Sequence, residues 1–268
     1  MCFASIHVRA DIIYRETYGI PPGATADLFA TAFDWQRFDQ NGVEVTTGGT
    51  AAGVNFSAQG RLSDVANVNA GPNSDGTFDA YVNGILYFAA GTTPSIGFTP
   101  EFSLNPANYI PGSIIFSWYE GNNTAPHNFR LAIRNPLGWF ASVDTFTTPA
   151  IALTSFGTQA ELKSLTYDPT ASRWLTVNFD GNYVPGASPG TGTTTNSTLG
   201  ALSLGGAPAA NLVGPITAFG VFGESNGGTG NRRIDTFQID AIPIPEPSAA
   251  VLLASAFIAL ARRSRRPY

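Results

Sequence analysis

Short runs in which apolar and polar residues alternate recur along most of this chain, separated by Gly, Pro, Asn and Asp. Such alternation, rich in aromatic and β-branched residues, is typical of half-buried β-strands. The periodicity of an amphipathic helix is almost absent from the same region. The expected strands cover residues 11–17, 29–38, 54–62, 78–90, 113–120, 128–135, 139–146, 173–180, 216–223 and 232–241.

The turn residues agree with an antiparallel arrangement of these strands. An Asn-Gly dipeptide at 41–42 is a strong hairpin signal, and NPLG at 135–138 joins two expected strands. We therefore expect a three-stranded antiparallel meander over residues 113–146. In the last strand, Ile234 and Phe237 are three positions apart where alternation requires two, which allows a β-bulge between them.

Together these patterns predict an all-β chain, folded as a single antiparallel two-sheet sandwich of the jelly-roll or lectin-like kind over residues 11–241. One face of each sheet is expected to be buried. Residues 184–210 are rich in Gly, Pro, Ser and Thr, and we expect them to form a flexible loop. The expected core residues are Phe116, Trp118, Leu131, Ile133, Phe140, Phe219, Phe237 and Ile239.

Composition and charge narrow the classes of function. Charged residues make up 12% of the 268 residues, and the formal net charge is −5. Residues 1–244 carry 10 Lys and Arg against 18 Asp and Glu, whereas residues 245–268 carry 4 Arg against 1 Glu. An acidic body does not attract phosphate backbones, so nucleic acid is not an expected partner. Cys2 is the only cysteine, which excludes an intrachain disulfide.

The C-terminal segment, residues 242–268, differs from everything before it. It begins IPIPEP, and its prolines favour extended backbone. Residues 249–261 are uncharged and mostly apolar, and they predict a short hydrophobic helix. That helix would be about 20 Å long, against roughly 30 Å of hydrocarbon in a bilayer, and snorkelling arginines with local thinning can offset the difference. The alternative is a core helix followed by a solvated basic end.

The order of elements in this segment resembles the PEP-CTERM sorting signal of Gram-negative bacteria. The motif is Pro245, Glu246 and Pro247, and the resemblance covers about 24 residues. After the apolar stretch comes a basic cluster expected to stay in the cytoplasm, made of Arg262, Arg263, Arg265 and Arg266.

This resemblance implies a route through the cell envelope and a processing partner. The chain would be exported across the inner membrane, anchored there by the C-terminal helix, and recognised by an exosortase, a membrane enzyme of the transpeptidase kind. Its final place would be the cell surface or the extracellular matrix, in association with exopolysaccharide or biofilm material. An anchor that is never cleaved is the alternative.

The N-terminal residues 1–10 leave two interpretations open. They end in VRA, which looks like the end of a signal-peptide cleavage site, or they are simply a frayed start. The lack of a clear N-terminal signal departs from the sorting-signal pattern. Less specifically, the body resembles concanavalin A-like and laminin-G-like sandwiches through the expected strands at 113–146 and 232–241. That resemblance concerns the fold and does not imply a function.

Catalytic chemistry finds little support in the residue pattern. The only histidines are His7 and His127, and His127 is expected on the surface. Paired carboxyls about 5–10 Å apart in a groove would favour a glycoside hydrolase or lyase. Two acids lie close in sequence to a tryptophan that is able to stack on a sugar ring. They are Glu120, near Trp118, and Asp34, beside Trp35.

Both tryptophans are equally suited to the core, which is the favoured place for them. The other acids considered are scattered: Glu101, Asp144, Glu161 and Asp180.

The sequence gives at most a weak indication of a metal site. Asn73, Asp75 and Asp79 alternate around Gly76, as oxygen ligands of a calcium ion would. Clusters of this composition are usually turns, so no metal or cofactor site is predicted, and calcium is the minor alternative. The favoured interpretation is an exported surface or matrix protein without catalytic residues, whose β-sandwich associates with polysaccharide. A secreted glycoside hydrolase or lyase on the same sandwich is the second interpretation.

Overall fold

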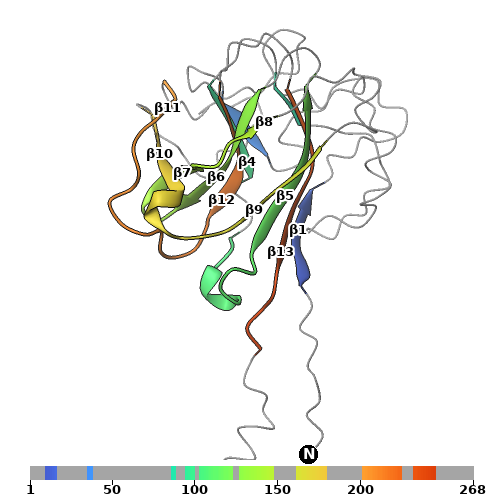
Figure 1. Cartoon of the computed structure of the whole chain (residues 1–268), viewed down its shortest axis with the longest axis vertical. Coiled ribbons are helices and arrows are strands. Elements are labelled where there is room, and N and C mark those ends of the chain that lie inside the picture. The colour runs from blue at the N-terminus through green and yellow to red at the C-terminus, as the bar shows by residue number, and fades with distance from the viewer. Residues whose placement is uncertain are drawn as a thin grey trace, which may run out of the picture.

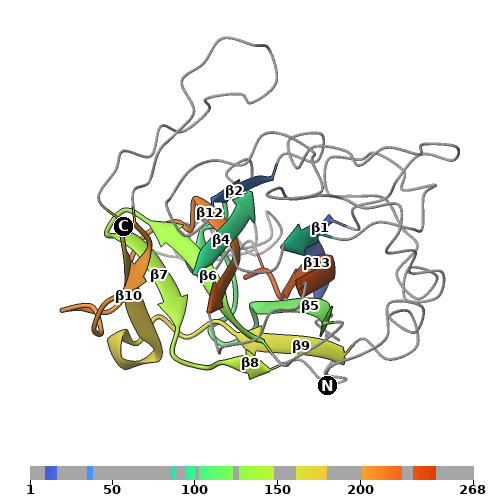
Figure 2. The same cartoon turned by 90° about the horizontal axis from the view of Figure 1, so that it is seen from above.

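Two antiparallel sheets lie face to face in the computed structural model, as Figures 1 and 2 show. The structure describes residues 10–16, 35–38, 86–88, 94–99, 103–122, 127–147, 161–179, 201–224 and 232–245. The smaller sheet has the order β1 (Asp11–Glu16), β13 (Arg232–Ala241), β5 (Ile115–Asn122) and β9 (Glu161–Thr166), and β3 (Leu86–Phe88) also pairs with β13.

The larger sheet runs in the order β11 (Ser203–Leu204), β10 (Trp174–Asn178), β7 (Gly138–Ser142), β6 (Asn128–Asn135), β12 (Ala218–Glu224), β4 (Ser95–Thr99) and β2 (Gln36–Phe38). A further short strand, β8 (Phe146–Thr147), pairs with β6. The helices in the described part of the chain are two single turns of 3-10 helix, η2 (Pro106–Asn108) and η4 (Ala171–Arg173). The predicted all-β, two-sheet antiparallel body is confirmed, and the predicted C-terminal helix lies outside the described residues.

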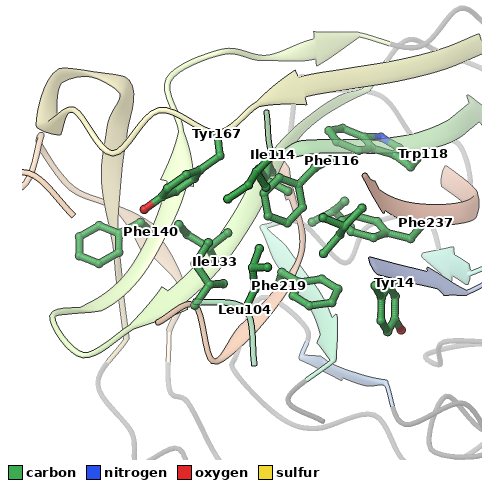
Figure 3. Packing of buried hydrophobic residues seen from close by; sticks show 14 of the residues in the cluster. Tyr14, Leu104, Ile114, Phe116, Trp118, Ile133, Phe140, Tyr167, Phe219 and Phe237 are labelled. Atoms are coloured by element: carbon green, nitrogen blue, oxygen red, sulfur yellow. The ribbon is translucent and has the colours of Figure 1, made fainter. Parts of the chain in front are cut away.

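An aromatic cluster fills the space between the sheets (Figure 3). Phe219 of β12 stacks on Phe237 of β13, with ring centroids 5.6 Å apart, and meets the edge of Tyr14 of β1 at 4.8 Å. Trp118 stacks on the same Phe237 at 5.8 Å. Aromatic pairs in such offset or edge-on geometry add to the free energy gained by burial. All eight residues expected in the core are buried, so that prediction is confirmed.

The larger sheet buries both of its faces, which differs from the expectation of one buried face per sheet. Its second face carries another hydrophobic cluster, in which Phe98 packs against Phe38 at 5.7 Å and against Trp139 at 4.4 Å. β12 shows why both faces are buried. Phe219 faces the other sheet, whereas Phe222, three residues later on the same strand, belongs to the second cluster. A strand that is apolar on both faces is a central strand of a covered sheet.

The predicted meander over 113–146 is wrong in its first half. β6 and β7 form the expected hairpin, and Asn135 pairs with Gly138 across the turn. β5, however, pairs with β9 and β13 in the smaller sheet and does not pair with β6. β6 has buried residues on both faces, so it takes a central place between β7 and β12. Sequence neighbours often pair, but the burial pattern of β6 requires two partners in the covered sheet.

Other sequence predictions have mixed outcomes. The bulge in β13 is confirmed, because its pairing with β5 shifts between Asp235 and Gln238, and Thr236 there has φ of 46°. Of the loop expected at 184–210, residues 201–210 differ from the prediction: they include β11, and Leu202 is buried. The prediction missed β4, which is buried throughout and does not alternate, and β9.

The start of β1 and the end of β13 lie side by side at one end of the sandwich (Figure 1). Asp11, at the start of β1, pairs with Ala241, at the end of β13. Beyond β13 the chain is still held, because Ile110 N–H donates to Ile242 O at 2.8 Å and Ile244 N–H donates to Asn108 O at 2.9 Å. The folded body therefore extends through Ile244, just before the Pro-Glu-Pro motif.

Candidate functional site

The predicted sorting motif begins where the described chain stops. Pro245 is exposed and is the last described residue, while Glu246, Pro247 and the basic cluster at 262–266 lie outside the described residues. No helix in the described ranges is long and apolar enough to cross a membrane. The C-terminal anchor, its processing and the cellular location of the chain stay predictions.

Glu120 is the most unusual acid in the described body. It lies on β5 with no exposed surface, on the same inward face as Trp118 two residues before it. Within the described part of the chain, neither carboxyl oxygen has a hydrogen-bond partner of regular geometry. Burial raises the pKa of Glu120 well above its usual range; the nearby Lys163 ammonium and Trp118 indole N–H lower this pKa, and the Glu161 carboxylate raises it further. The protonated form is favoured because a buried carboxylate lacks solvation.

Glu120 and the two tryptophans considered for sugar stacking do not form an open site. Trp35 donates from Nε1 to the Tyr14 hydroxyl at 3.1 Å, and both Trp35 and Trp118 are fully buried. The preference for the core over a sugar-stacking role is confirmed for both rings. Glu120 cannot touch a polymer in solution while it has no exposed surface.

Two of the remaining acids are engaged in ion pairs. Asp144 forms an ion pair with Arg173 at 2.8 Å, and Glu161 pairs with Lys163. The other acids weighed in the sequence lie outside the described residues: Asp34, Glu101 and Asp180.

The expectation of a surface position for His127 is wrong. Only 2% of His127 is exposed. It directly precedes β6 and lies two residues before Phe129, which is buried in the inter-sheet core. Side chains two apart on an extended chain share a face, so His127 continues the inward face of β6.

The outer face of the smaller sheet gathers polar groups from four strands. We define this outer face as Arg15, Ser117, Tyr119, Leu162, Ser164, Gln238 and Asp240. In the strand register Arg15 stands opposite Gln238, Gln238 opposite Ser117, and Ser117 opposite Ser164. Each of these residues is partly or fully exposed. The row therefore crosses the whole sheet on the side away from the core.

Hydrogen bonds fix part of this outer face in place. Arg15 Nε donates to Gln238 Oε1 at 2.8 Å, and Gln238 Nε2 donates to Asp240 Oδ2 at 2.8 Å. Beside them lie Tyr119, partly exposed, and its cross-strand partner Leu162, which is 57% exposed. Preorganised polar side chains next to a partly exposed ring are suited to a hydroxyl-rich ligand, since the ring covers apolar C–H surface while the polar groups bind hydroxyls.

Sequence reasoning missed this outer face. Its signal was present in β13, where Gln238 and Asp240 alternate with the core residues Phe237, Ile239 and Ala241. The alternation alone does not say which strands lie beside β13. No cluster of three or more His, Cys, Asp or Glu side chains able to hold a metal ion occurs in the described ranges, and Asn73, Asp75 and Asp79 lie outside them.

No family model matches the sequence, and no curated protein matches it. Comparison with solved structures finds the CBM22-1 xylan-binding domain of Paenibacillus barcinonensis Xyn10C, with 10% identity, a TM-score of 0.35, and coverage of 88% of this chain and 97% of that one. It also finds the C-terminal family 22 carbohydrate-binding module of Clostridium thermocellum Xyn10B, with 12% identity, a TM-score of 0.23, and coverage of 61% of this chain and 76% of that one. At these TM-scores the likeness carries no argument about function.

Proposed function

We propose that this chain is an exported surface protein of a Gram-negative bacterium, with a β-sandwich that binds polysaccharide and a C-terminal segment that an exosortase recognises. The observation that carries the proposal is the order of elements after the sandwich. Backbone hydrogen bonds hold the chain up to Ile244, and the Pro-Glu-Pro motif, the apolar stretch and the arginine cluster follow directly. A processing enzyme could then act next to the motif without opening the sandwich.

The outer face of the smaller sheet supports the polysaccharide-binding part of this proposal. Its arginine, glutamine and aspartate are linked by hydrogen bonds, and its tyrosine is partly exposed. Hydroxyl groups of a glycan can both donate to the Asp240 carboxylate and accept from amide or guanidinium N–H groups. Binding would use a rigid sheet surface, which lowers the entropy cost of association.

The sorting part is tested in the native host with two full-length variants. In one variant Glu246 becomes Ala, and in the other the four arginines at 262–266 become Ser. We expect both to stay in the cell or inner membrane, unprocessed, as followed by fractionation and intact mass. Glu161→Ala, an exposed acid on β9, is the matched control and should be sorted like the parent. Parent-like trimming and surface delivery of both tail variants would contradict the sorting role.

The binding part has its own test. The full chain, solubilised in mild detergent, is passed over immobilised exopolysaccharide from the producing strain. Retention that soluble exopolysaccharide competes away is the expected result. No retention on this polymer or on a broad glycan array would end the polysaccharide proposal and leave the sorting proposal standing.

A glycoside hydrolase is the second candidate, favoured by one observation. Glu120, whose pKa is raised by burial, stands opposite Glu161 in the β5–β9 register. Glycoside hydrolysis uses two carboxyl groups, one of which keeps its proton and acts as the acid. The burial of Glu120 weighs against it. Release of reducing ends from the exopolysaccharide, lost in Glu120→Gln and in Glu161→Gln, would support the hydrolase over simple binding.

A further inference from the structure

One end of the sandwich is built from four segments that contact one another. We call it the base and define it as residues 105–113, 135–138, 211–217 and 242–245. Asn108 and Ile110 bond to the last segment through their backbones, and Asn135 donates from Nδ2 to Val213 O at 3.4 Å. Leu104, directly before the first segment, exchanges backbone hydrogen bonds of 2.8 and 2.7 Å with Ile216 of the third segment. The base is therefore one connected surface.

The base differs in charge from the rest of the body. None of its four segments contains a charged residue. Each segment instead exposes one large aliphatic side chain: Ile110 at 36%, Leu137 at 52%, Val213 at 59% and Ile244 at 49%. Single exposed aliphatic residues are ordinary on protein surfaces, but four on connected, uncharged segments make a candidate interaction surface.

Charged side chains stand at the border of the base and are engaged there. Arg134 precedes the second segment and donates to Thr217 Oγ1 at 3.5 Å. Asp240, before the last segment, accepts from Gln238. Asp168 is on the loop whose Pro169 O accepts from Leu212 N–H at 2.8 Å. These three charged groups therefore lie beside the segments of the base and not within them.

The position of the base along the chain identifies its partner. The folded body ends at Ile244, and the apolar stretch begins at Ala249, five residues later. Extended chain spans at most about 3.3–3.6 Å per residue, so this connection reaches roughly 18 Å at most. If residues 249–261 enter a bilayer, the end of the body that faces the bilayer is the end from which the connection leaves. Figure 1 shows that η2 and the end of β13 lie together at that end.

We propose that the base is a membrane-docking surface that lies on the outer leaflet of the inner membrane while the C-terminal segment is inserted. Its partner is the lipid headgroup interface, with Ile110, Leu137, Val213 and Ile244 reaching the boundary with the acyl chains. This inference rests on membrane insertion of the tail, which belongs to the proposed function. It adds an orientation: the sandwich stands on its base, and the motif at 245–247 is held at the membrane surface.

Physical chemistry favours lipid over other partners for this surface. Aliphatic side chains without nearby charge partition into the interface by burying apolar area. A body with excess acid is repelled by anionic lipid headgroups, and an uncharged base is the part of its surface that avoids this repulsion. A glycan would call for aromatic rings and paired polar side chains. Those features occur on the outer face of the smaller sheet and not among the four exposed residues of the base.

The test measures the depth of single labels in the full chain. Cys2 is changed to Ser, and one cysteine at a time is placed at Leu137, Val213 or Ile244 and labelled with an environment-sensitive fluorophore. Leu162→Cys, 57% exposed on β9, is the matched control, and Ser255→Cys reports on the tail. The protein is reconstituted into vesicles of phosphatidylethanolamine and phosphatidylglycerol that carry a quencher at the headgroup or along the acyl chain.

The expected result is strong headgroup quenching at Leu137, Val213 and Ile244, several-fold above that at Leu162, with acyl-chain quenching at Ser255. Quenching at Ser255 while the base labels match Leu162 would overturn the inference and leave tail insertion intact. Base quenching without quenching at Ser255 would support docking and contradict the proposed insertion. If neither is quenched, both ideas fail. Base labels that lose iodide access with rising protein concentration, without lipid quenching, would assign the surface to a second copy and overturn lipid docking.

Discussion

The two faces of the smaller sheet are formed by the same strands but have different surroundings. Along β5, Phe116, Trp118 and Glu120 point inward and are fully buried, while Ser117 and Tyr119 between them face outward. The inward set packs against a second sheet, so its members are large and mostly apolar. The outward set contacts solvent and neighbouring polar side chains. A single period-two pattern thus encodes a stable core on one side and a polar, partly exposed surface on the other.

Removing an inward aromatic ring has the largest expected effect. Phe237 contacts Trp118, Phe219 and Trp35, so Phe237→Ala leaves a cavity that several rings border. We expect both Phe237→Ala and Trp118→Ala to lower the free energy of unfolding by about 3–5 kcal/mol. Urea unfolding of the chain ending at Pro245 measures the loss. A cost below about 1 kcal/mol would show that the ring is not part of a packed core.

Removing an outward-facing ring from the same sheet should cost less stability. Tyr119 lies on β5, next to Trp118, but it is only partly buried, and its ring is absent from the core cluster. Tyr119→Ala is therefore expected to cost about 1 kcal/mol or less. An equal cost for the two faces would contradict the contrast between them, and would mean that the outer face also carries a buried layer.

The inward face was readable from the sequence because alternation decides it locally. Each expected core residue stood at an inward position of its own run, and neighbouring strands did not need to be known. The partners of β5 were not readable in this way, because long stretches of chain separate β5 from β9 and from β13. Only the strand register brings Arg15, Ser117, Ser164 and Gln238 into one row.

The places where the sequence misled have physical causes of the same kind. β4 and β6 are buried on both faces, so they lack the clean alternation of a half-buried strand. His127 was expected at the surface because it lies between two strands, but the inward face of β6 begins with it. In each case the burial of a residue is decided by a partner element that is distant in sequence.

Glu120 is the exception on the inward face, and its effect should depend on pH. Because burial raises the pKa of Glu120 in the folded state, the folded chain keeps its proton at pH values where the unfolded chain has lost it. The stability contributed by this group is therefore fully present below the unfolded pKa of about 4.3 and is lost as pH rises through the folded pKa. Glu120→Gln removes this titration, so its stability should fall less than that of the parent as pH rises.

We expect Glu120→Gln to be more stable than the parent at alkaline pH by about 1–3 kcal/mol, since an unpartnered buried carboxylate is replaced by a neutral amide. Unfolding free energies measured by urea at a series of pH values give the comparison. Glu161→Gln, at an exposed position on the neighbouring strand, is the control and should follow the parent more closely. Parallel curves for parent and Glu120→Gln would mean that Glu120 does not titrate abnormally.

The last expected change is in binding, and it concerns only the outer face. Gln238 accepts from Arg15 and donates to Asp240, so Gln238→Ala removes the link between two charged groups without touching the core. If this row binds polysaccharide, Gln238→Ala and Tyr119→Ala should each weaken retention by about tenfold, or 1.4 kcal/mol, while the fold persists. Val143→Ala, an exposed position on the other sheet's side of the molecule, is the control. Affinity electrophoresis in exopolysaccharide, compared with the unfolding free energy of each variant, separates an effect on binding from an effect on stability.

Unchanged retention of both variants would move the binding surface away from the smaller sheet. Loss of retention together with loss of stability would show that the two faces are not independent.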